Sequence, residues 1–178
     1  MRKVIITALT GGIHGKEVNP NLPEQPDEIV AQALASRDAG AAVVHMHVRD
    51  REGKVSTDVD SFRQVHDRIK AQSDVIVQLT TGAGIGMSVD ERAQVMSLRP
   101  EMCSLNLTTC CFLFGGKESF YQNFPSDIRA FAERMREYGI KPELEAYSVE
   151  SLVEIERLVA HGLLHKPYYV NLVLGIPA

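Results

Sequence analysis

Short apolar runs alternate along this chain with longer segments of helical period. The runs recur at intervals of roughly 30 to 40 residues, which is about the size of one strand-helix unit. Val, Ile and Leu fill most of the first three runs, as expected of parallel strands that are buried on both faces. The pattern predicts parallel strands over Lys3–Leu9, Ala42–Val48, Val75–Thr80, Met102–Leu107, Lys141–Ala146 and Tyr168–Leu174.

The helical segments between these strands have recognisable ends. Pro26 stands where a first helical residue belongs, and Gly40 follows the end of the same segment. Ser88 and Glu91 have the spacing of a capping box, in which each side chain satisfies a backbone donor of the other residue. Further N-caps are predicted at Asp58, Ser126 and Ser148, and further helix stops at Gly139 and Gly162.

This alternation fits either an open doubly wound sheet or part of an eight-stranded barrel. The first strand runs into Thr10-Gly-Gly-Ile-His-Gly-Lys16, which is not the glycine pattern of a dinucleotide-binding sheet. Polar residues also gather at the C-terminal ends of several strands, where a barrel keeps its active site. We therefore predict an α/β fold, a TIM (β/α)8 barrel of which residues 1–178 supply about the first six strands. We expect one domain, truncated at its C-terminus.

Composition and charge narrow the possible partners. The chain has 178 residues, of which 44% are hydrophobic and 24% charged, and its formal net charge is −4. No Lys/Arg-rich run is present, which argues against a nucleic-acid partner. The first apolar stretch is too short for a secretory signal or a membrane span, so we predict a cytoplasmic protein without a membrane partner.

The cysteines do not indicate a disulfide-bonded or zinc-stabilised fold. Cys103, Cys110 and Cys111 are odd in number and have no C-x-x-C spacing. That spacing fits neither a disulfide framework nor a structural zinc site. We predict reduced thiols that are buried near one strand end.

The sharpest candidate site lies in the second predicted strand. Side chains alternate along a strand, so His45 and His47 share one face while Val44 and Met46 take the other. The backbones of the two histidines are then roughly 6–7 Å apart, a spacing from which both rings can lean onto one ion. The pattern predicts two ligands of a divalent metal. The alternative is a pair of histidines that are hydrogen-bonded and inert.

Two further residues near this strand are candidates for contact with a substrate. Arg49 continues the histidine face, and its guanidinium could hold a carboxylate in a catalytic site. A local salt bridge with Asp50 or Glu52 is the alternative. His14 lies in the loop after the first strand, on the presumed active side, and could touch the substrate.

Polar side chains also mark the ends of the third and fourth predicted strands. The third strand runs into Thr80–Gly86, whose exposed backbone N–H groups and hydroxyls could cradle an anion; a plain turn is the alternative. Ser104, Asn106 and Thr108 share one face of the fourth strand. Burying them costs free energy unless they bond each other, water or a ligand, and a satisfied interior network is the alternative.

The fifth predicted strand carries two carboxylates. Glu143, Glu145 and Tyr147 share a face, and the residues between them include apolar ones. Two carboxylates that face a barrel interior require a cation, a proton or a network of donors. Either glutamate could act as an acid or base, and the sequence does not divide these roles.

With these residues at these positions, the sequence resembles the β-keto acid cleavage enzyme family. The resemblance covers the whole chain, and its most specific part is the segment from Asp38 to Asp50, which reads Asp-Ala-Gly-Ala-Ala-Val-Val-His-Met-His-Val-Arg-Asp. Other matching segments are the Thr-Gly-Gly loop after the first strand, Leu22–Ile29, Thr80–Gly82, Pro100–Asn106 and Lys141–Glu145.

The resemblance implies a zinc-dependent TIM-barrel acyltransferase, usually a homotetramer. Such an enzyme condenses a β-keto acid with acetyl-CoA and releases acetoacetate and a new CoA thioester. By the resemblance, His45 and His47 are two zinc ligands, and the zinc binds the keto oxygen and the carboxylate of the substrate. It also implies a substrate carboxylate site, with Glu143 or Glu145 nearby, that is lined by Thr81, Gly82, Ser104, Asn106 and Thr108.

The resemblance further implies groups from strands after the sixth. These are a glutamate as third zinc ligand, an aspartate base and an arginine that assists the base. The chain stops at Ala178, before such strands. We therefore expect a truncated form of a longer protein, and little catalysis from residues 1–178 alone.

Two other functions remain open on the sequence. One is a different metal-dependent reaction on the same barrel, by an aldolase or a hydrolase; hydrolases with His-x-His usually carry it on the first strand rather than the second. The other is an inactive barrel fragment that persists by association with a partner chain. A zinc content of about one ion per chain would favour a metal enzyme over the inactive fragment.

Overall fold

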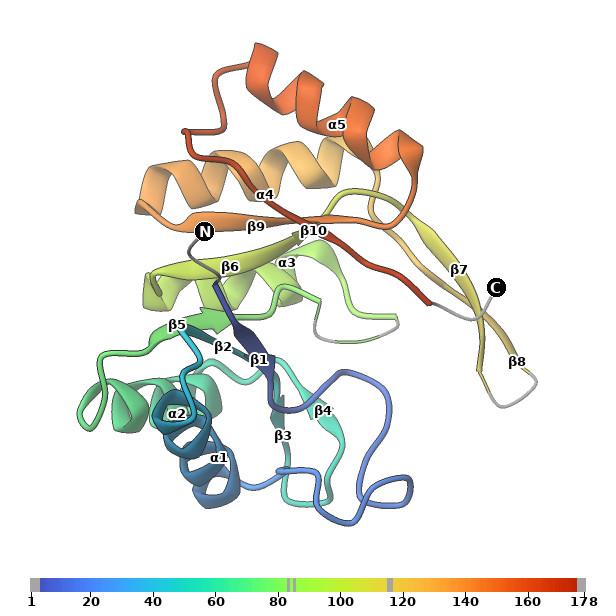
Figure 1. The fold of residues 1–178 in the computed structure, drawn as a ribbon. Coiled ribbons are helices and arrows are strands. Elements are labelled where there is room, and N and C mark those ends of the chain that lie inside the picture. Colours follow the sequence, from blue (N-terminus) through green and yellow to red (C-terminus); the bar gives the residue numbers. More distant parts are fainter. Residues whose placement is uncertain (1–3, 83, 85, 115–116, 176–178) are drawn as a thin grey trace.

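The computed structural model of this chain contains a curled sheet with helices on its outer side (Figure 1). It describes residues 4–82, 84, 86–114 and 117–175. The strands of the main sheet lie in the order β1-β2-β5-β6-β9-β10, and all neighbouring strands are parallel. They are β1 (Ile6–Ala8), β2 (Val43–Met46), β5 (Ile76–Leu79), β6 (Met102–Asn106), β9 (Lys141–Ala146) and β10 (Tyr169–Leu172). All six predicted parallel strands are found, most of them shorter than predicted, and Lys3 of the first lies outside the described residues.

Helices connect successive strands of this sheet. Right-handed crossovers that always move in the same direction place every helix on the same side, which curls the sheet toward a barrel. In agreement, α1 contacts β2, α2 contacts β5, α4 contacts β6 and β9, and α5 contacts β9. The helices are α1 (Pro26–Asp38), α2 (Val59–Lys70), α3 (Val89–Ala93) with its 3-10 continuation η1 (Gln94–Leu98), α4 (Pro125–Tyr138) and α5 (Val149–Ala160).

Most of the predicted helix ends are confirmed, with one exception. The Asp58 carboxylate accepts the Ser61 N–H at 2.8 Å, and the Ser88 hydroxyl accepts the Glu91 N–H at 3.2 Å. The predicted N-cap at Ser126 is wrong, because α4 begins at Pro125. Proline has no N–H to lose and a φ that suits the first helical position, so it starts the helix one residue before the serine.

Two short antiparallel hairpins were not predicted. One pairs β3 (Val48–Arg49) with β4 (Val55–Ser56), so the second sheet strand ends at Met46 rather than at the predicted Val48. The other pairs β7 (Cys110–Phe114) with β8 (Lys117–Tyr121) and projects from the body of the molecule (Figure 1). Such hairpins satisfy their backbone groups locally, without the apolar periodicity that reveals a buried strand.

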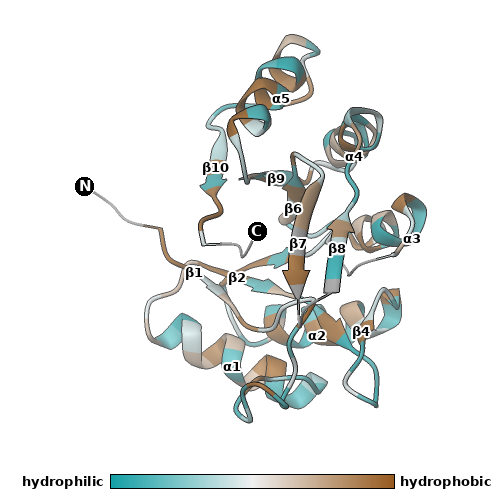
Figure 2. Ribbon diagram, turned by 90° about the vertical axis from the view of Figure 1, so that its right-hand side faces the viewer, coloured by the Kyte–Doolittle hydropathy of each residue, from teal (hydrophilic) through white to brown (hydrophobic). Residues whose placement is uncertain are grey.

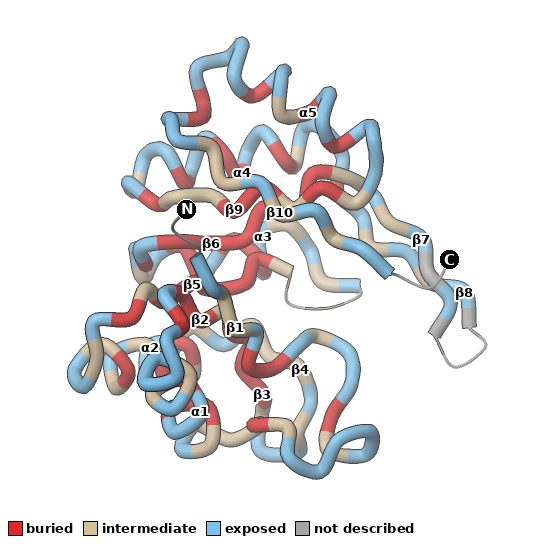
Figure 3. The backbone as a smooth tube through the Cα atoms, viewed as in Figure 1, coloured by how far each residue is buried: buried red, intermediate tan, exposed pale blue. Residues whose placement is uncertain are grey.

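The hydrophobic core lies between the sheet and the helices. Buried residues concentrate on β2, β5 and β6, at the centre of the sheet (Figure 3). The helices carry both hydrophobic and hydrophilic residues (Figure 2), as expected of helices that cover one face of a sheet. Side chains of the core that are at most 2% exposed include Val44, Met46, Phe62, Ile69, Val77, Leu79, Leu105 and Phe131.

The described part of the sheet has two open edges, β1 and β10. On β10 the side chains of Val170 and Leu172 are 41% and 62% exposed, although both are apolar. A parallel strand of a closed barrel would bury such residues. The described residues therefore form a half-barrel. No helix within them is long and apolar enough to cross a membrane.

The three cysteines are free, as predicted. Cys103 is buried at the start of β6, and its burial raises the pKa of the thiol. The prediction that all three thiols are buried is wrong, because Cys111 is exposed on β7 of the projecting hairpin.

Candidate functional site

The strand register gathers polar side chains on the inner, concave face of the sheet. In the parallel pairs His45 lies opposite Gln78, Ser104 lies opposite Glu143, and Asn106 lies opposite Glu145. Residues opposite each other on neighbouring strands point to the same face. Because the helices cover the other face, these side chains are left to line the inside of the half-barrel.

His45 and His47 lie close together, as the sequence predicted. Their ring centroids are 5.3 Å apart and the ring planes are inclined by 67°. Burial lowers the pKa of His45 to about 4, although Gln78 beside it partly opposes this. Burial, with the neighbouring charges of His45 and Arg49, holds the pKa of His47 well below its ordinary value. Both imidazoles are therefore neutral near pH 7, which is the form that binds a metal.

The lack of hydrogen bonds at two histidine nitrogens is also compatible with metal binding. The Nδ1 atoms of His45 and His47 are buried and have no hydrogen-bond partner. A buried polar atom without a partner costs roughly 1–3 kcal/mol, so a ligand that satisfies both atoms would be favoured. Among the described residues, however, no group of three His, Cys, Asp or Glu side chains is arranged to hold a metal ion. The described chain therefore offers two donors to a cation.

Arg49 ties the first loop to the histidine strand. Its Nη2 donates to the carbonyl oxygens of Gly11 at 2.5 Å and His14 at 2.8 Å, and its Nη1 donates to that of Gly53 at 3.0 Å. The alternative of a local salt bridge with Asp50 or Glu52 is not found among the residues that the structure describes. The guanidinium thus positions the loop.

The same loop packs directly against the second histidine. A Cβ added at Gly12 would lie 3.2 Å from Cε1 and 3.4 Å from Nδ1 of His47. A glycine therefore allows the loop backbone to approach the ring closely. The side chain of His14, two residues further on, is exposed.

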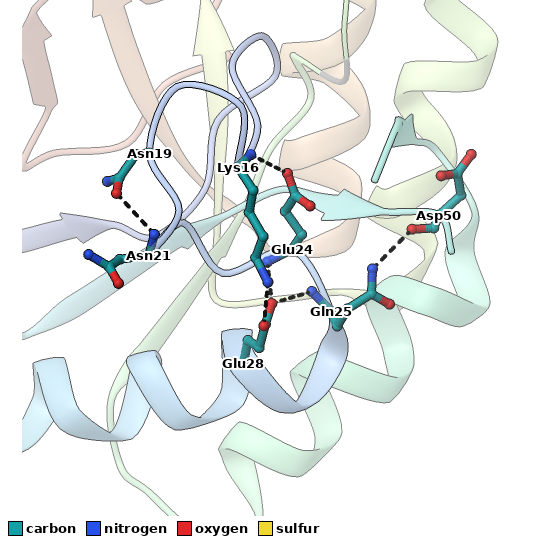
Figure 4. A network of polar contacts seen from close by, with 7 residues as sticks. All are labelled: Lys16, Asn19, Asn21, Glu24, Gln25, Glu28 and Asp50. Atoms are coloured by element: carbon teal, nitrogen blue, oxygen red, sulfur yellow. Dashed lines mark hydrogen bonds and ion pairs between the residues drawn. The ribbon is translucent and has the colours of Figure 1, made fainter. Parts of the chain in front are cut away.

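Hydrogen bonds from Lys16 to Glu24 and Glu28 form a second anchor for the loop between β1 and α1 (Figure 4). Lys16 donates its backbone N–H to Glu24 at 2.8 Å and its Nζ to Glu28 at 2.5 Å. The other oxygen of Glu28 accepts the backbone N–H groups of Glu24 at 2.9 Å and Gln25 at 3.1 Å. The hydrogen bond from Lys16 contributes most to the lowered pKa of Glu28, which is about 2, and the two backbone N–H groups lower it further.

This anchor yields a prediction for Glu28→Gln. The folded pKa of Glu28 lies below its ordinary value of 4.5, so the carboxylate stabilises the fold above about pH 4.5, and this stability is lost as the pH falls toward 2. Because the Glu28 side chain is 40% exposed, we expect the substitution to cost only about 0.5–1 kcal/mol at pH 7. Denaturant unfolding at pH 7 and pH 3 measures the difference, which should shrink at the lower pH.

Limited digestion with trypsin measures the effect on the loop. We expect cleavage after Lys16 to be about threefold faster in Glu28→Gln, because the side chain of Lys16 loses its charged partner. Glu133→Gln breaks an exposed pair with Arg129 at 2.8 Å on α4, and serves as the control. Equal rates of cleavage after Lys16 in both variants would contradict the anchoring role.

Hydrogen bonds join predicted carboxylate-binding residues of β6 to those of the turn after β5. Thr81 donates its N–H to the Ser104 hydroxyl at 3.1 Å and its own hydroxyl to the Ser104 carbonyl at 2.7 Å. The Gly82 N–H bonds the Thr80 hydroxyl at 2.8 Å. The bonds of Ser104 belong to the interior network that was the alternative for Ser104, Asn106 and Thr108, and contact of these residues with a substrate stays a prediction. On the same face the Asn106 side chain accepts the Thr108 N–H at 3.0 Å.

The two glutamates of β9, of which Glu143 is buried and Glu145 half-buried, have raised pKa values. Burial raises the pKa of Glu143, against the opposing effect of Gln78, which donates a hydrogen bond to it, and of Asn171. Burial and the nearby charge of Glu143 raise the pKa of Glu145 to about 8, although the Tyr147 hydroxyl opposes this from 3.4 Å. Glu145 can therefore hold a proton at neutral pH and release it in slightly basic solution.

Sequence reasoning missed Gln78 as a member of this site. Its side chain is fully buried and contacts Glu143, and its residue pairs with His45 in the sheet. The sequence did carry a signal, because Gln78 is a polar residue within an apolar strand, two positions before Thr80. Burying such a side chain costs free energy unless it has a hydrogen-bond partner. Gln78 thus links the histidine strand to the glutamate strand.

The chain matches the β-keto acid cleavage enzyme family over residues 3–178. It is 40% identical over 178 residues to the 3-keto-5-aminohexanoate cleavage enzyme of Acetoanaerobium sticklandii, covering 99% of this chain and 64% of that protein. It is 35% identical to the 3-dehydrocarnitine:acetyl-CoA trimethylamine transferase of Rhizobium meliloti, covering 99% of this chain and 66% of that one. The chain thus spans about two thirds of the length of these relatives.

A solved structure supports the fold. The ternary complex of ObcA with a C4-CoA adduct and oxalate superposes with a TM-score of 0.74, at 24% sequence identity. The match covers 88% of this chain and 38% of that one. The α/β fold predicted from the sequence is confirmed, and the half-barrel corresponds to part of a longer chain in that neighbour.

Proposed function

This chain belongs to the β-keto acid cleavage enzyme family, and we propose that its concave face binds a β-keto acid for cleavage with acetyl-CoA. The reaction would exchange acyl groups: the acetyl group of acetyl-CoA joins the carboxymethyl part of the keto acid to give acetoacetate, and the acyl part of the keto acid takes the CoA to form the new thioester. Relatives named as acetyl-CoA transferases act on 3-dehydrocarnitine, 3,5-dioxohexanoate and 3-oxoadipate, which supports the use of acetyl-CoA as co-substrate.

The observation that carries this proposal is the pair His45 and His47, whose ring centroids lie 5.3 Å apart and whose Nδ1 atoms are buried. Both imidazoles are neutral, and their Nδ1 atoms lack partners beside a loop that packs closely on His47. A zinc ion held there, with a third ligand from outside the described residues, would act as a Lewis acid toward the keto oxygen. The histidines would hold the cation without competition from protons at pH 7.

The carboxyl groups of β9 would handle protons in this site. Glu145 is the better placed to hold and release one near neutral pH, because its pKa is raised to about 8. Glu143 is tied to Gln78, so it would orient that side chain beside His45. Arg49 would act by holding the loop that carries His14, rather than by transferring a proton.

The strand ends would bind the carboxylate of the substrate. The residues proposed for this role supply hydroxyl, amide and backbone N–H donors, which suit a carboxylate oxygen. They are Thr81, Gly82, Ser104, Asn106 and Thr108, with His14 contacting the remainder of the substrate. We further propose one barrel domain over residues 1–178, a homotetramer, and a cytoplasmic location.

The direct test is a product assay. Zinc-loaded protein is incubated with acetyl-CoA carrying a labelled acetyl group and with a panel of β-keto acids, and labelled acetoacetate is measured. We expect label in acetoacetate with at least one acid. Cleavage of a keto acid that is equally fast without acetyl-CoA would indicate an aldolase or hydrolase instead. No labelled acetoacetate from any acid would defeat the proposal.

A further inference from the structure

Arg92 is a buried arginine that none of the proposed steps uses. It lies in α3 and is 3% exposed. All three of its nitrogens donate to neutral oxygens: Nε to the Thr81 carbonyl at 2.7 Å, Nη1 to the Gln122 carbonyl at 3.0 Å, and Nη2 to the Asn123 side chain at 2.7 Å. Burying a cation is costly, so this arrangement requires a compensating role or a dense set of bonds.

Two aromatic rings complete the surroundings of Arg92. Its guanidinium carbon lies 4.5 Å from the ring centroid of Tyr121 and 5.0 Å from that of Phe131. The Tyr121 hydroxyl also donates to the Thr81 carbonyl, at 3.2 Å. Within the described part of the chain, no carboxylate oxygen lies within 4.0 Å of its guanidinium nitrogens.

Asn123 extends these contacts to the end of β6. Its amide donates to the Thr108 carbonyl at 3.1 Å, and its backbone N–H bonds the Thr109 hydroxyl at 2.9 Å. Arg92 therefore joins three segments that are distant in the sequence: the turn after β5, the turn after β6, and the base of the β7–β8 hairpin. Two of these turns contain residues that we assign to the carboxylate site.

The Thr81 backbone is consequently held from both sides. Its N–H and hydroxyl bond Ser104, and its carbonyl accepts from Arg92 and Tyr121. The orientation of the following peptide, which carries the Gly82 N–H, depends on where that carbonyl points. A donor fork of fixed shape is suited to this task, whereas lysine has a single nitrogen on a flexible stem.

We propose that Arg92 is a positioning residue, which sets the Thr81–Gly82 turn and the Thr108 turn at the separation needed to bind the substrate carboxylate. The proposal rests on the proposed function for the identity of the ligand. It adds a residue outside the concave face that controls affinity for the keto acid. It also gives the β7–β8 hairpin a role, since Tyr121 and Asn123 at its base complete the same set of bonds.

The test compares Arg92→Lys with the parent protein, loaded with zinc. We expect the KM for the keto acid to rise about tenfold, because at least one donor to the turn is lost, while the KM for acetyl-CoA stays within about twofold. Hydrogen exchange at the Thr81 and Gly82 N–H groups should be about tenfold faster. A loss of thermal stability without change in either quantity would overturn the proposal.

Two further variants make the test specific. Tyr121→Phe keeps the ring beside the guanidinium but removes its bond to the Thr81 carbonyl, so we expect a change in the same direction of about threefold. If Arg92→Lys does not fold, Tyr121→Phe decides: unchanged keto-acid KM and exchange would overturn the proposal. Arg99→Lys is the matched control, since Arg99 also lies over a tyrosine ring, 5.2 Å from Tyr138, and is exposed.

The outcomes for the two proposals are separable. If the parent protein makes no acetoacetate from any keto acid, the proposed function fails. The exchange rates of Thr81 and Gly82 in the two variants then still show whether Arg92 fixes the turn. If the parent protein is active and the variants match it in keto-acid KM and exchange, only the positioning role fails.

Discussion

Replacing His45 with alanine is expected to lower the affinity for zinc by at least about 100-fold, because a metal site loses at least this much when one of few ligands is removed. The imidazole lies on the concave face and its Nδ1 has no partner, so the core is left intact. In the presence of a chelator we therefore expect thermal unfolding to be unchanged or slightly delayed. Competition with a coloured zinc chelator measures the affinity.

His66→Ala is the matched control for this experiment. His66 lies on α2, where its Nδ1 contacts the Asp67 carboxylate at 2.9 Å, away from the concave face. We expect its zinc affinity to equal that of the parent protein. Equal affinity in His45→Ala and His66→Ala would contradict the assignment of His45 as a ligand.

Replacing Glu145 with glutamine is expected to stabilise the protein in basic solution. The folded pKa of about 8 lies above the ordinary value of 4.5, so the folded chain binds this proton more tightly than the unfolded chain does. Stability from this group is present below about pH 4.5 and is lost as the pH rises toward 8. Glutamine does not ionise, so the variant does not lose this stability as the pH rises. At pH 8 we expect its free energy of unfolding to exceed that of the parent protein by roughly 2–4 kcal/mol, with little difference at pH 5.

Urea unfolding of the metal-free protein at both pH values measures this effect. The same substitution removes a group that exchanges protons, so we expect acetoacetate formation to fall at least about 100-fold. A gain in stability together with a loss of activity is typical of a residue kept for function. Glu156→Gln, on the exposed side of α5, should change neither quantity, and a stability gap that is equal at pH 5 and pH 8 would exclude Glu145 as the titrating group.

Features of the fold that depend on neighbouring residues were predictable, and those that depend on distant residues were not. The buried strands and most helix ends were predictable, because apolar period, proline and capping residues act within a few positions of the chain. The start of α4 was predicted wrongly where two local signals competed, with Pro125 against Ser126. The hairpins were missed because their short strands carry no buried periodicity.

The same division applies to the candidate site. Alternation along β2 and β9 was sufficient to predict that His45 and His47 share a face, and that Glu143 and Glu145 do as well. It did not predict that Gln78 bonds Glu143, or that Arg49 holds the carbonyls of Gly11 and His14. Those contacts join residues that lie tens of positions apart in the chain.

By itself, the sequence determined which segments form the main parallel sheet and its helices, and which polar side chains share a face of a strand, because both follow from the period of apolar residues. The tertiary structure alone decided the partners and charge states of those side chains. Strand register brings Gln78 to Glu143, and the packing of α3 brings the Arg92 fork to the turn after β5 and to the base of the β7–β8 hairpin. Burial and distance, which fix pKa values and hydrogen bonds, exist only once the chain is folded.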